Sequence, residues 1–155
     1  MATVYIGVGS NIGNRQDYLD RAKNEIKRIP NVQWLAESSI HETDPVGGPE
    51  QGRYLNAVWK IQTDLKPESL FRRLMAIERM LGRVRTIPNG PRTIDLDVLS
   101  YDARALKNGS LTIPHSRMHE REFVLRPFSE IDPNWVHPIL KKDVSELLEE
   151  LFAYH

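Results

Sequence analysis

Residues 90–99 read Gly-Pro-Arg-Thr-Ile-Asp-Leu-Asp-Val-Leu, and from Thr93 onward polar and apolar side chains alternate. This period of two predicts a half-buried β-strand, because successive side chains of a strand point to opposite faces. Asp95 and Asp97 would share one face, about 6.5–7 Å apart. The apolar side chains would face a core on the other side: Ile94, Leu96 and Val98.

Two carboxylates on one face of a strand suit a hard divalent cation such as magnesium. The preceding segment adds positive charge, because residues 79–92 contain no acid and four arginines: Arg79, Arg83, Arg85 and Arg92. Guanidinium groups beside a carboxylate pair fit a polyphosphate bound together with its metal. The same residues also fit a plainer arrangement, in which both aspartates lie on the solvent face of a sheet and pair with surface arginines. From the residues alone both interpretations stay open.

The composition favours one domain without a nucleic-acid or membrane role. The 155 residues suit a single domain over 1–155, and lysine plus arginine equal aspartate plus glutamate at 21 each. A nucleic-acid module usually carries a basic excess, which is missing here. The sequence has no cysteine, which excludes disulfides and zinc–thiolate sites, and no apolar run of about 18 residues or more. We therefore expect a cytoplasmic protein that acts as a monomer, with neither a nucleic-acid nor a membrane partner.

The remaining pattern predicts the element order β-α-β-β-α-β, followed by helical pieces. Strands are expected over 3–8, 32–43 and 54–63, before the strand that starts at Thr93. Asn14 would cap a helix that ends at Pro30, and Gly82 would stop a helix that opens at Pro67. Residues 102–109 look turn-like, and residues 144–152 fit a last amphipathic helix. This order is typical of an α+β, ferredoxin-like α/β sandwich with a mainly antiparallel sheet, split βαβ units and extra C-terminal helices.

One face of that sheet would take the helices, and the other would be left open or covered by loops. Glycines on a strand let another group approach the backbone closely. The segment 44–53 contains two prolines and three glycines, and long irregular segments of this kind are often functional. The open face, and with it a site, would carry Gly7, Gly9, Tyr54, Asn56, Asp95 and Asp97.

Several single residues remain ambiguous from their own setting. His115 fits a phosphate donor and a structural histidine equally well. Tyr54 and Phe123 fit stacking on a flat heterocycle, although the sequence alone favours core positions for both. Asn56, taken by itself, is more typical of a surface amide than of a ligand-binding group.

Several separate stretches resemble the 6-hydroxymethyl-7,8-dihydropterin pyrophosphokinases of folate biosynthesis. They occur in the order of that family and span nearly the whole chain: Ile6-Gly7-x-Gly9-Ser10-Asn11, Thr43-x-Pro45-x-Gly47, Tyr54-Leu55-Asn56-Ala57, Gly82-Arg83-Val84-Arg85, Gly90-Pro91-Arg92-Thr93-x-Asp95-Leu96-Asp97, Thr112-x-Pro114-His115 and Arg121-x-Phe123-x-Leu125-x-Pro127. The resemblance implies transfer of pyrophosphate from ATP to the pterin hydroxymethyl group, giving AMP and the pterin diphosphate. It also implies a ferredoxin-like fold and two magnesium ions.

The resemblance further implies roles for individual residues. Asp95 and Asp97 would hold both magnesium ions, and Arg83 and Arg92 would stabilise the transferred group. ATP would be contacted by Glu78, Arg85, Arg92, Val98, Thr112, His115 and Arg121. The pterin would be contacted by Thr43, Pro45, Val46, Tyr54, Asn56 and Phe123, with the two aromatic residues stacked on its rings. In the family, an arginine and a tyrosine that help to bind ATP often stand where this chain has Ser110 and Ser116.

Two other classes of function compete with this one. A different magnesium-dependent nucleotide enzyme on the same scaffold, such as a phosphohydrolase, would turn over ATP without a pterin. An RNA-binding module would use stacked aromatics on an open sheet, but it calls for a basic surface and an RNP-type aromatic run, which this sequence lacks. The pyrophosphokinase accounts for the carboxylates, the arginines and the candidate stacking residues together.

Overall fold

The computed structural model describes residues 1–44, 52–82 and 92–153. Its main sheet contains β1 (Ala2–Ser10), β2 (Val32–Glu37), β3 (His41–Thr43), β4 (Tyr54–Thr63) and β5 (Asp95–Tyr101). A hairpin of β6 (Leu106–Asn108) and β7 (Leu111–Ile113) follows β5. The helices are α1 (Arg15–Arg28), α2 (Pro67–Met80), the short 3-10 helix η1 (Met118–Glu120), α3 (Glu122–Ile131) and α4 (Val144–Ala153).

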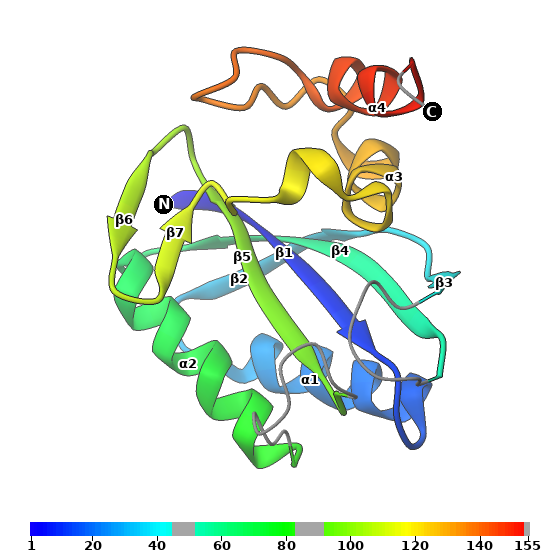
Figure 1. Ribbon diagram of the computed structural model, residues 1–155. Helices are drawn as coiled ribbons and strands as arrows, with labels where there is room; N and C mark the ends of the chain where they lie inside the picture. Colours follow the sequence, from blue (N-terminus) through cyan, green and yellow to red (C-terminus); the bar gives the residue numbers. More distant parts are fainter. Residues whose placement is uncertain (45–51, 83–91, 154–155) are drawn as a thin grey trace.

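The main sheet is antiparallel and has the strand order β2-β4-β1-β5, with β3 also paired to β4 (Figure 1). Because β4 separates β1 from β2, the unit β1-α1-β2 is a split βαβ, and β4-α2-β5 is a second one with β1 in its gap. The predicted ferredoxin-like sandwich is therefore confirmed. It leaves β1 in the middle of the sheet and β5 at one edge.

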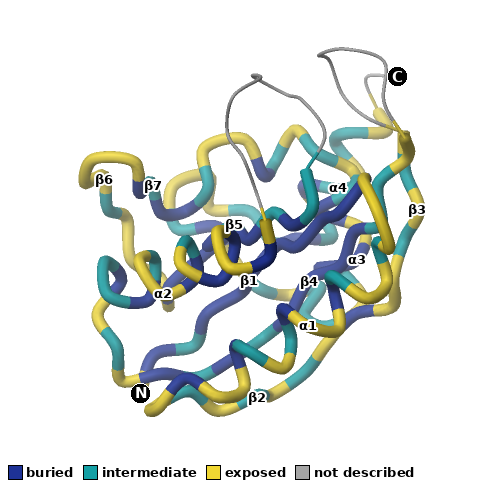
Figure 2. Tube along the Cα trace, turned by 90° about the horizontal axis from the view of Figure 1, so that it is seen from below, coloured by how far each residue is buried: buried dark blue, intermediate teal, exposed yellow. Residues whose placement is uncertain are grey.

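One face of the sheet packs against α1 and α2 and forms the larger core (Figure 1). The apolar alternation of the strands supplies this face, as expected: Val4, Ile6, Val8, Ile94, Leu96 and Val98 are all buried. The side chain of Asn14 accepts a hydrogen bond from the Asp17 N–H at 3.1 Å, which caps α1. Gly82 follows α2 with φ +88°, a conformation that favours glycine at this position. Figure 2 shows buried positions along the central strands and exposed turns on α1 and α2.

The opposite face is only partly open, which corrects the expectation of an open or loop-covered face. Helix α3 packs on it, α4 packs on α3, and both helices contribute to a second core (Figure 1). Tyr5 of β1 stacks on Phe128 of α3 with ring centroids 4.4 Å apart, and Trp135 meets the same tyrosine edge-on. The Tyr5 hydroxyl donates a hydrogen bond to Asp132. These contacts cover the face near the start of β1 and leave the part beside Gly7 and Gly9 to the site described below.

Three sequence predictions of element limits need correction. The strand expected over 32–43 is two strands, because Ser38 interrupts it: its N–H donates to the Val58 carbonyl at 2.9 Å, while its hydroxyl accepts from the Val58 N–H at 2.9 Å. Residues 102–109, expected as a turn, include β6, which pairs with β7 around Gly109 at φ +60°. The strand expected from Thr93 begins two residues later, at Asp95. Within the described residues, no helix is long and apolar enough to cross a membrane.

Candidate functional site

A cavity of about 300 Å³ lies on the sheet face that α1 and α2 do not cover. Its floor is formed by β1, β4 and β5, and its wall by the segment from residue 115 to the start of α3. The lining contains the described residues predicted to act on the pterin or on the transferred group: Thr43, Tyr54, Asn56, Arg92, Asp95, Asp97 and Phe123. It also contains two residues predicted to contact ATP, His115 and Arg121. The structure thus brings together residues that are distant in the sequence.

The strand register explains why β1 carries glycines at this point. Gly9 pairs with Asn56 of β4 on one side and with Asp95 of β5 on the other, and Gly7 pairs with Asp97. A Cβ added to Gly9 would lie 3.0 Å from Asn56 Oδ1 and 3.3 Å from Tyr54 Cδ1. The central strand therefore provides a floor without side chains, flanked by an amide on one side and carboxylates on the other.

Asp95 and Asp97 project from β5 on the same face, and both line the cavity. The Arg92 guanidinium lies 2.9 Å from Asp95 Oδ2, with both side chains partly buried. Although partial burial opposes it, the neighbouring Asp95 carboxylate raises the pKa of Arg92 above its usual value, so Arg92 stays charged. The two carboxylates are the described groups here that could hold a magnesium ion, since hard oxygen ligands suit it.

Asn56, Thr43 and Phe123 also line this cavity. The Asn56 amide is buried and donates a hydrogen bond to Thr43 Oγ1 of β3. This bond fixes the orientation of the amide, so its remaining polar atoms have a defined direction. The Arg121 guanidinium lies 5.5 Å from the centre of the Phe123 ring. Two further predicted pterin residues, Pro45 and Val46, lie outside the described residues.

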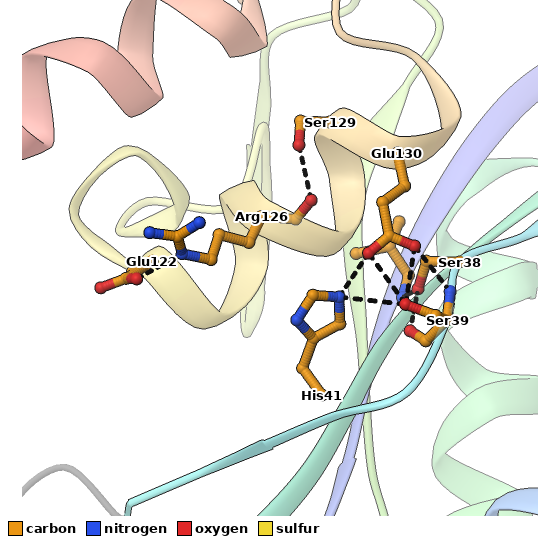
Figure 3. Close-up of polar contacts among 8 residues, drawn as sticks. Ser38, Ser39, His41, Glu122, Arg126, Ser129 and Glu130 are labelled. Carbon is orange, nitrogen blue, oxygen red and sulfur yellow. Dashed lines mark hydrogen bonds and ion pairs between the residues drawn. The ribbon is translucent and has the colours of Figure 1, made fainter.

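A polar cluster lies between β3 and α3, the helix that carries Phe123. Glu130 of α3 accepts hydrogen bonds from the Ser39 N–H and hydroxyl, both at 2.8 Å, and contacts His41 Nε2 (Figure 3). Although partial burial opposes the shift, the bonds from Ser39 and His41 lower the pKa of Glu130. Ser39 and Glu130 contact the same histidine nitrogen, whereas a nucleophilic triad uses both ring nitrogens. The cluster therefore ties α3 to the β2–β3 connection and is no triad.

A second cavity of about 400 Å³ lies on the other side of β5, next to α2 and β7. Its lining includes three predicted ATP residues, Val98, Thr112 and His115. Ser110 and Ser116 line it as well, and so does Met75 of α2. Asp97 and His115 line both cavities, which therefore meet at these two side chains.

His115 is held as a neutral donor at this junction. Burial lowers its pKa, the nearby Arg121 charge lowers it further, and Asp95 opposes the shift. Nδ1 accepts the Arg117 N–H at 3.3 Å, so in the neutral ring the proton is on Nε2. An N–H donor at that nitrogen suits a phosphate oxygen or another acceptor.

Glu78 differs from the other predicted ATP residues. Its side chain is only 1 % exposed and lines neither cavity, and one carboxylate oxygen accepts the Leu96 N–H at 2.8 Å. The carboxylate thus supports the backbone of β5 between the two aspartates. Arg83 and Arg85 lie outside the described residues.

The chain was compared with known families and structures. The family model described as 7,8-dihydro-6-hydroxymethylpterin-pyrophosphokinase (HPPK) matches residues 5–133. The chain belongs to the HPPK family. A pyrophosphokinase of this kind from Haemophilus influenzae is 41% identical over 155 residues, covering 100% of this chain and 96% of the relative. The Aquifex aeolicus relative is 35% identical and covers 97% of this chain and 92% of its own length.

Other HPPK relatives are much longer than this chain. The folic acid synthesis protein fol1 of Schizosaccharomyces pombe is 39% identical over 95% of this chain, which spans only 20% of that protein. A crystal structure of an HPPK-DHPS in complex with substrates superposes with a TM-score of 0.77 over 99% of this chain and 44% of that one. At 12% identity this match shows the fold alone.

Sequence reasoning missed part of the lining of the two cavities. Leu99, Arg117 and Val124 also line the first cavity, and Phe71 and Leu111 line the second. Leu99 continues the alternation of Asp95 and Asp97, so the strand pattern could have placed it on this face. The other four depend on how α2, β7 and the start of α3 pack, and the sequence carries no local signal for that.

Proposed function

We propose that this chain transfers pyrophosphate from ATP to the hydroxymethyl group of 6-hydroxymethyl-7,8-dihydropterin, giving AMP and the pterin diphosphate, as a step of folate biosynthesis. The observation that carries the proposal is the pair of cavities that share Asp97 and His115. A reaction between two substrates needs two adjoining sites whose reactive ends meet, and this arrangement offers them. We also propose that residues 1–155 act as one domain, because helices from both halves of the chain pack on the same sheet.

The first cavity suits the pterin. Asn56, oriented by Thr43, offers hydrogen-bonding groups for the edge of the ring system, and Tyr54 and Phe123 offer aromatic surface for its faces. The bare backbone of Gly9 leaves room for a flat molecule above β1. Pro45 and Val46 are proposed to complete this side.

The second cavity suits the nucleotide. Val98 and Thr112 line it near the apolar side chains of α2, while His115 stands where it meets the first cavity. His115, with Nε2 protonated, would donate to a phosphate oxygen. Arg121 and Arg92 line the first cavity, so they are proposed to contact the phosphates on the pterin side of the junction. Arg85 is proposed as a further contact, and Glu78 is proposed to act on the nucleotide through the β5 backbone that it supports.

Asp95 and Asp97 fit magnesium, and we propose that they hold two ions. Both are acceptor-only carboxylates on one face of β5, and Arg92 beside them offsets part of their charge. Held by Asp95 and Asp97, magnesium would supply positive charge for the phosphates and would make the pterin hydroxyl more acidic. The protein groups position the substrates in line and place positive charge from Arg92 and Arg83 around the transferred group, which is what such transfers chiefly require.

The direct test supplies purified protein with ATP, magnesium and 6-hydroxymethyl-7,8-dihydropterin and measures AMP and pyrophosphorylated pterin. Asp95→Ala and Asp97→Ala are each expected to lower kcat by ~100-fold or more, because each removes a ligand charge at the reacting phosphates. Both residues face the cavity, so the circular dichroism spectrum and the unfolding midpoint should stay close to those of the parent protein.

Asp20→Ala is the matched control, because Asp20 is exposed on α1, on the other side of the sheet. It should leave turnover unchanged. The proposal fails if the parent protein forms no AMP, or forms it equally without the pterin, as a phosphohydrolase would. Loss of folding in both aspartate variants would instead show that the carboxylates have a structural role.

A further inference from the structure

Asn11 lies in the turn between β1 and α1 and is only 5 % exposed. It makes two hydrogen bonds with the backbone of Arg92: its Oδ1 accepts the Arg92 N–H at 2.8 Å, and its own N–H donates to the Arg92 carbonyl at 3.0 Å. Its Nδ2 donates to the Gly52 carbonyl at 3.2 Å. A buried side chain thus connects three segments that are far apart in the sequence.

Each partner of Asn11 leads directly to the site. Arg92 stands three residues before β5, and its guanidinium lies 2.9 Å from Asp95 Oδ2. Gly52 stands two residues before Tyr54, the first residue of β4. A Cβ on Gly52 would lie 3.2 Å from the Asn11 carbonyl oxygen, so the two backbones approach closely there. Asn11 therefore contacts the backbone of the arginine beside the carboxylates and the backbone just before β4, the strand that carries Tyr54 and Asn56.

We propose that Asn11 is a positioning residue for the transfer reaction, and that it acts by holding the Arg92 backbone so that the guanidinium stays beside Asp95. This inference rests on the proposed function. Among the described residues, Asn11 is in the lining of neither cavity, so its proposed effect on the reaction runs through Arg92. Its amide is suited to the task because one planar group accepts from Arg92 and donates to Gly52 at once.

The alternative is that Asn11 only satisfies buried backbone groups and thereby stabilises the fold. Both roles predict a loss of stability when the side chain is removed, because the Arg92 N–H would lose its acceptor. They differ in kinetics. A positioning role predicts a loss in kcat that depends on the Arg92 side chain, since misplacement of a reacting group by ~1 Å can cost about 100-fold. A structural role predicts no such dependence.

The test is a double-mutant cycle of Asn11→Ala and Arg92→Ala, with kcat and both KM values measured at saturating magnesium. Asn11→Ala alone is expected to lower kcat by ~10–100-fold while the KM for pterin and for ATP change less. In the Arg92→Ala background the same change should alter kcat by no more than about twofold, because the group that Asn11 positions is already gone. Equal effects of Asn11→Ala in both backgrounds would overturn the proposal.

Asn14→Ala is the matched control, an asparagine-to-alanine change in the same turn. Asn14 is exposed and caps α1, so its loss should lower the unfolding midpoint and leave kcat unchanged. If Asn11→Ala does not fold, Asn11→Ser replaces it in the cycle. Serine keeps a polar group in the turn but lacks the amide that joins Arg92 to Gly52. If the parent protein lacks pterin-dependent AMP formation, the proposed function fails. If the parent protein is active but the effects of the two substitutions on kcat are additive, the proposed role of Asn11 fails while the proposed function stands.

Discussion

Gly9→Ala tests whether the floor of the first cavity must be free of side chains. The added Cβ would lie 3.0 Å from Asn56 Oδ1 and 3.3 Å from Tyr54 Cδ1, so both side chains must move by a few tenths of an ångström. Forced repacking of this kind costs about 1–3 kcal/mol, and the lower freedom of the unfolded chain offsets about 0.4–1 kcal/mol. We expect the free energy of unfolding to fall by about 1–2 kcal/mol.

The kinetic effect of Gly9→Ala should be confined to one substrate. Displacing Asn56 weakens a hydrogen bond worth about 0.5–1.5 kcal/mol, so the KM for the pterin should rise ~2–10-fold. The KM for ATP should change by less than about twofold, since the second cavity does not include this strand. Urea unfolding and steady-state kinetics measure both quantities.

Gly7→Ala is the comparison for this variant. Its Cβ would meet Leu99 Cδ2 at 3.2 Å, at the end of a flexible side chain, and would not approach Asn56 or Tyr54. It should therefore raise the pterin KM less than Gly9→Ala does. A folded Gly9→Ala protein with an unchanged pterin KM, or an equal rise in both variants, would refute the reasoning.

Two further predictions concern residues around β5. Glu78→Ala should lower the free energy of unfolding, measured in urea, by about 2–4 kcal/mol, because the Leu96 N–H loses a buried acceptor and a cavity remains. Glu78→Gln keeps an acceptor oxygen, so its free energy of unfolding should fall clearly less. Equal losses in the two variants would contradict this role. Burial lowers the pKa of His115 from 6.5, so below that pH the unfolded chain binds more protons at this site, and stability should fall as the pH falls from about 6.5 towards the lowered pKa. His115→Gln should flatten this part of the stability–pH curve. The remaining slope would come from His137, because burial lowers the pKa of that residue as well. An unchanged slope would show that His115 does not contribute.

The strand at the centre of the site could be predicted from the sequence because its pattern is local. Ile94 and Leu96 are 0 % and 1 % exposed, while Asp95 and Asp97 between and beside them reach the cavity. The period of two encodes this directly, since a shift by one residue would bury both carboxylates. The helix limits at Asn14 and Gly82 were predictable for the same reason, because capping chemistry involves only residues close in sequence.

Features that depend on packing could not be predicted in this way. Tyr5 shares a strand face with Gly7 and Gly9, yet it is buried against Phe128 while they face the cavity. Only the docking of α3 and α4 separates the two environments, and no local pattern encodes that docking. Glu78 is a second case: its place next to the helical stripe fits a side chain turned towards β5, but its burial and its bond from the Leu96 N–H depend on how α2 packs.

The place of β5 at the sheet edge gives the site its two-sided form. Within the part of the chain that the structure describes, the neighbour of β5 in the sheet is β1, and its other edge faces α2 and β7, where the second cavity lies. The first cavity lies above the paired edge, at Gly7 and Gly9. Neighbouring strands are about 4.8 Å apart. A carboxylate on β5, together with a bound metal, can therefore reach groups on either side of that strand. Asp97 occupies that position and lines both cavities. A further strand paired to β5 would occupy the second cavity and leave Asp97 beside the first cavity alone, so the proposed in-line transfer requires that the described edge of β5 next to this cavity carries no further strand.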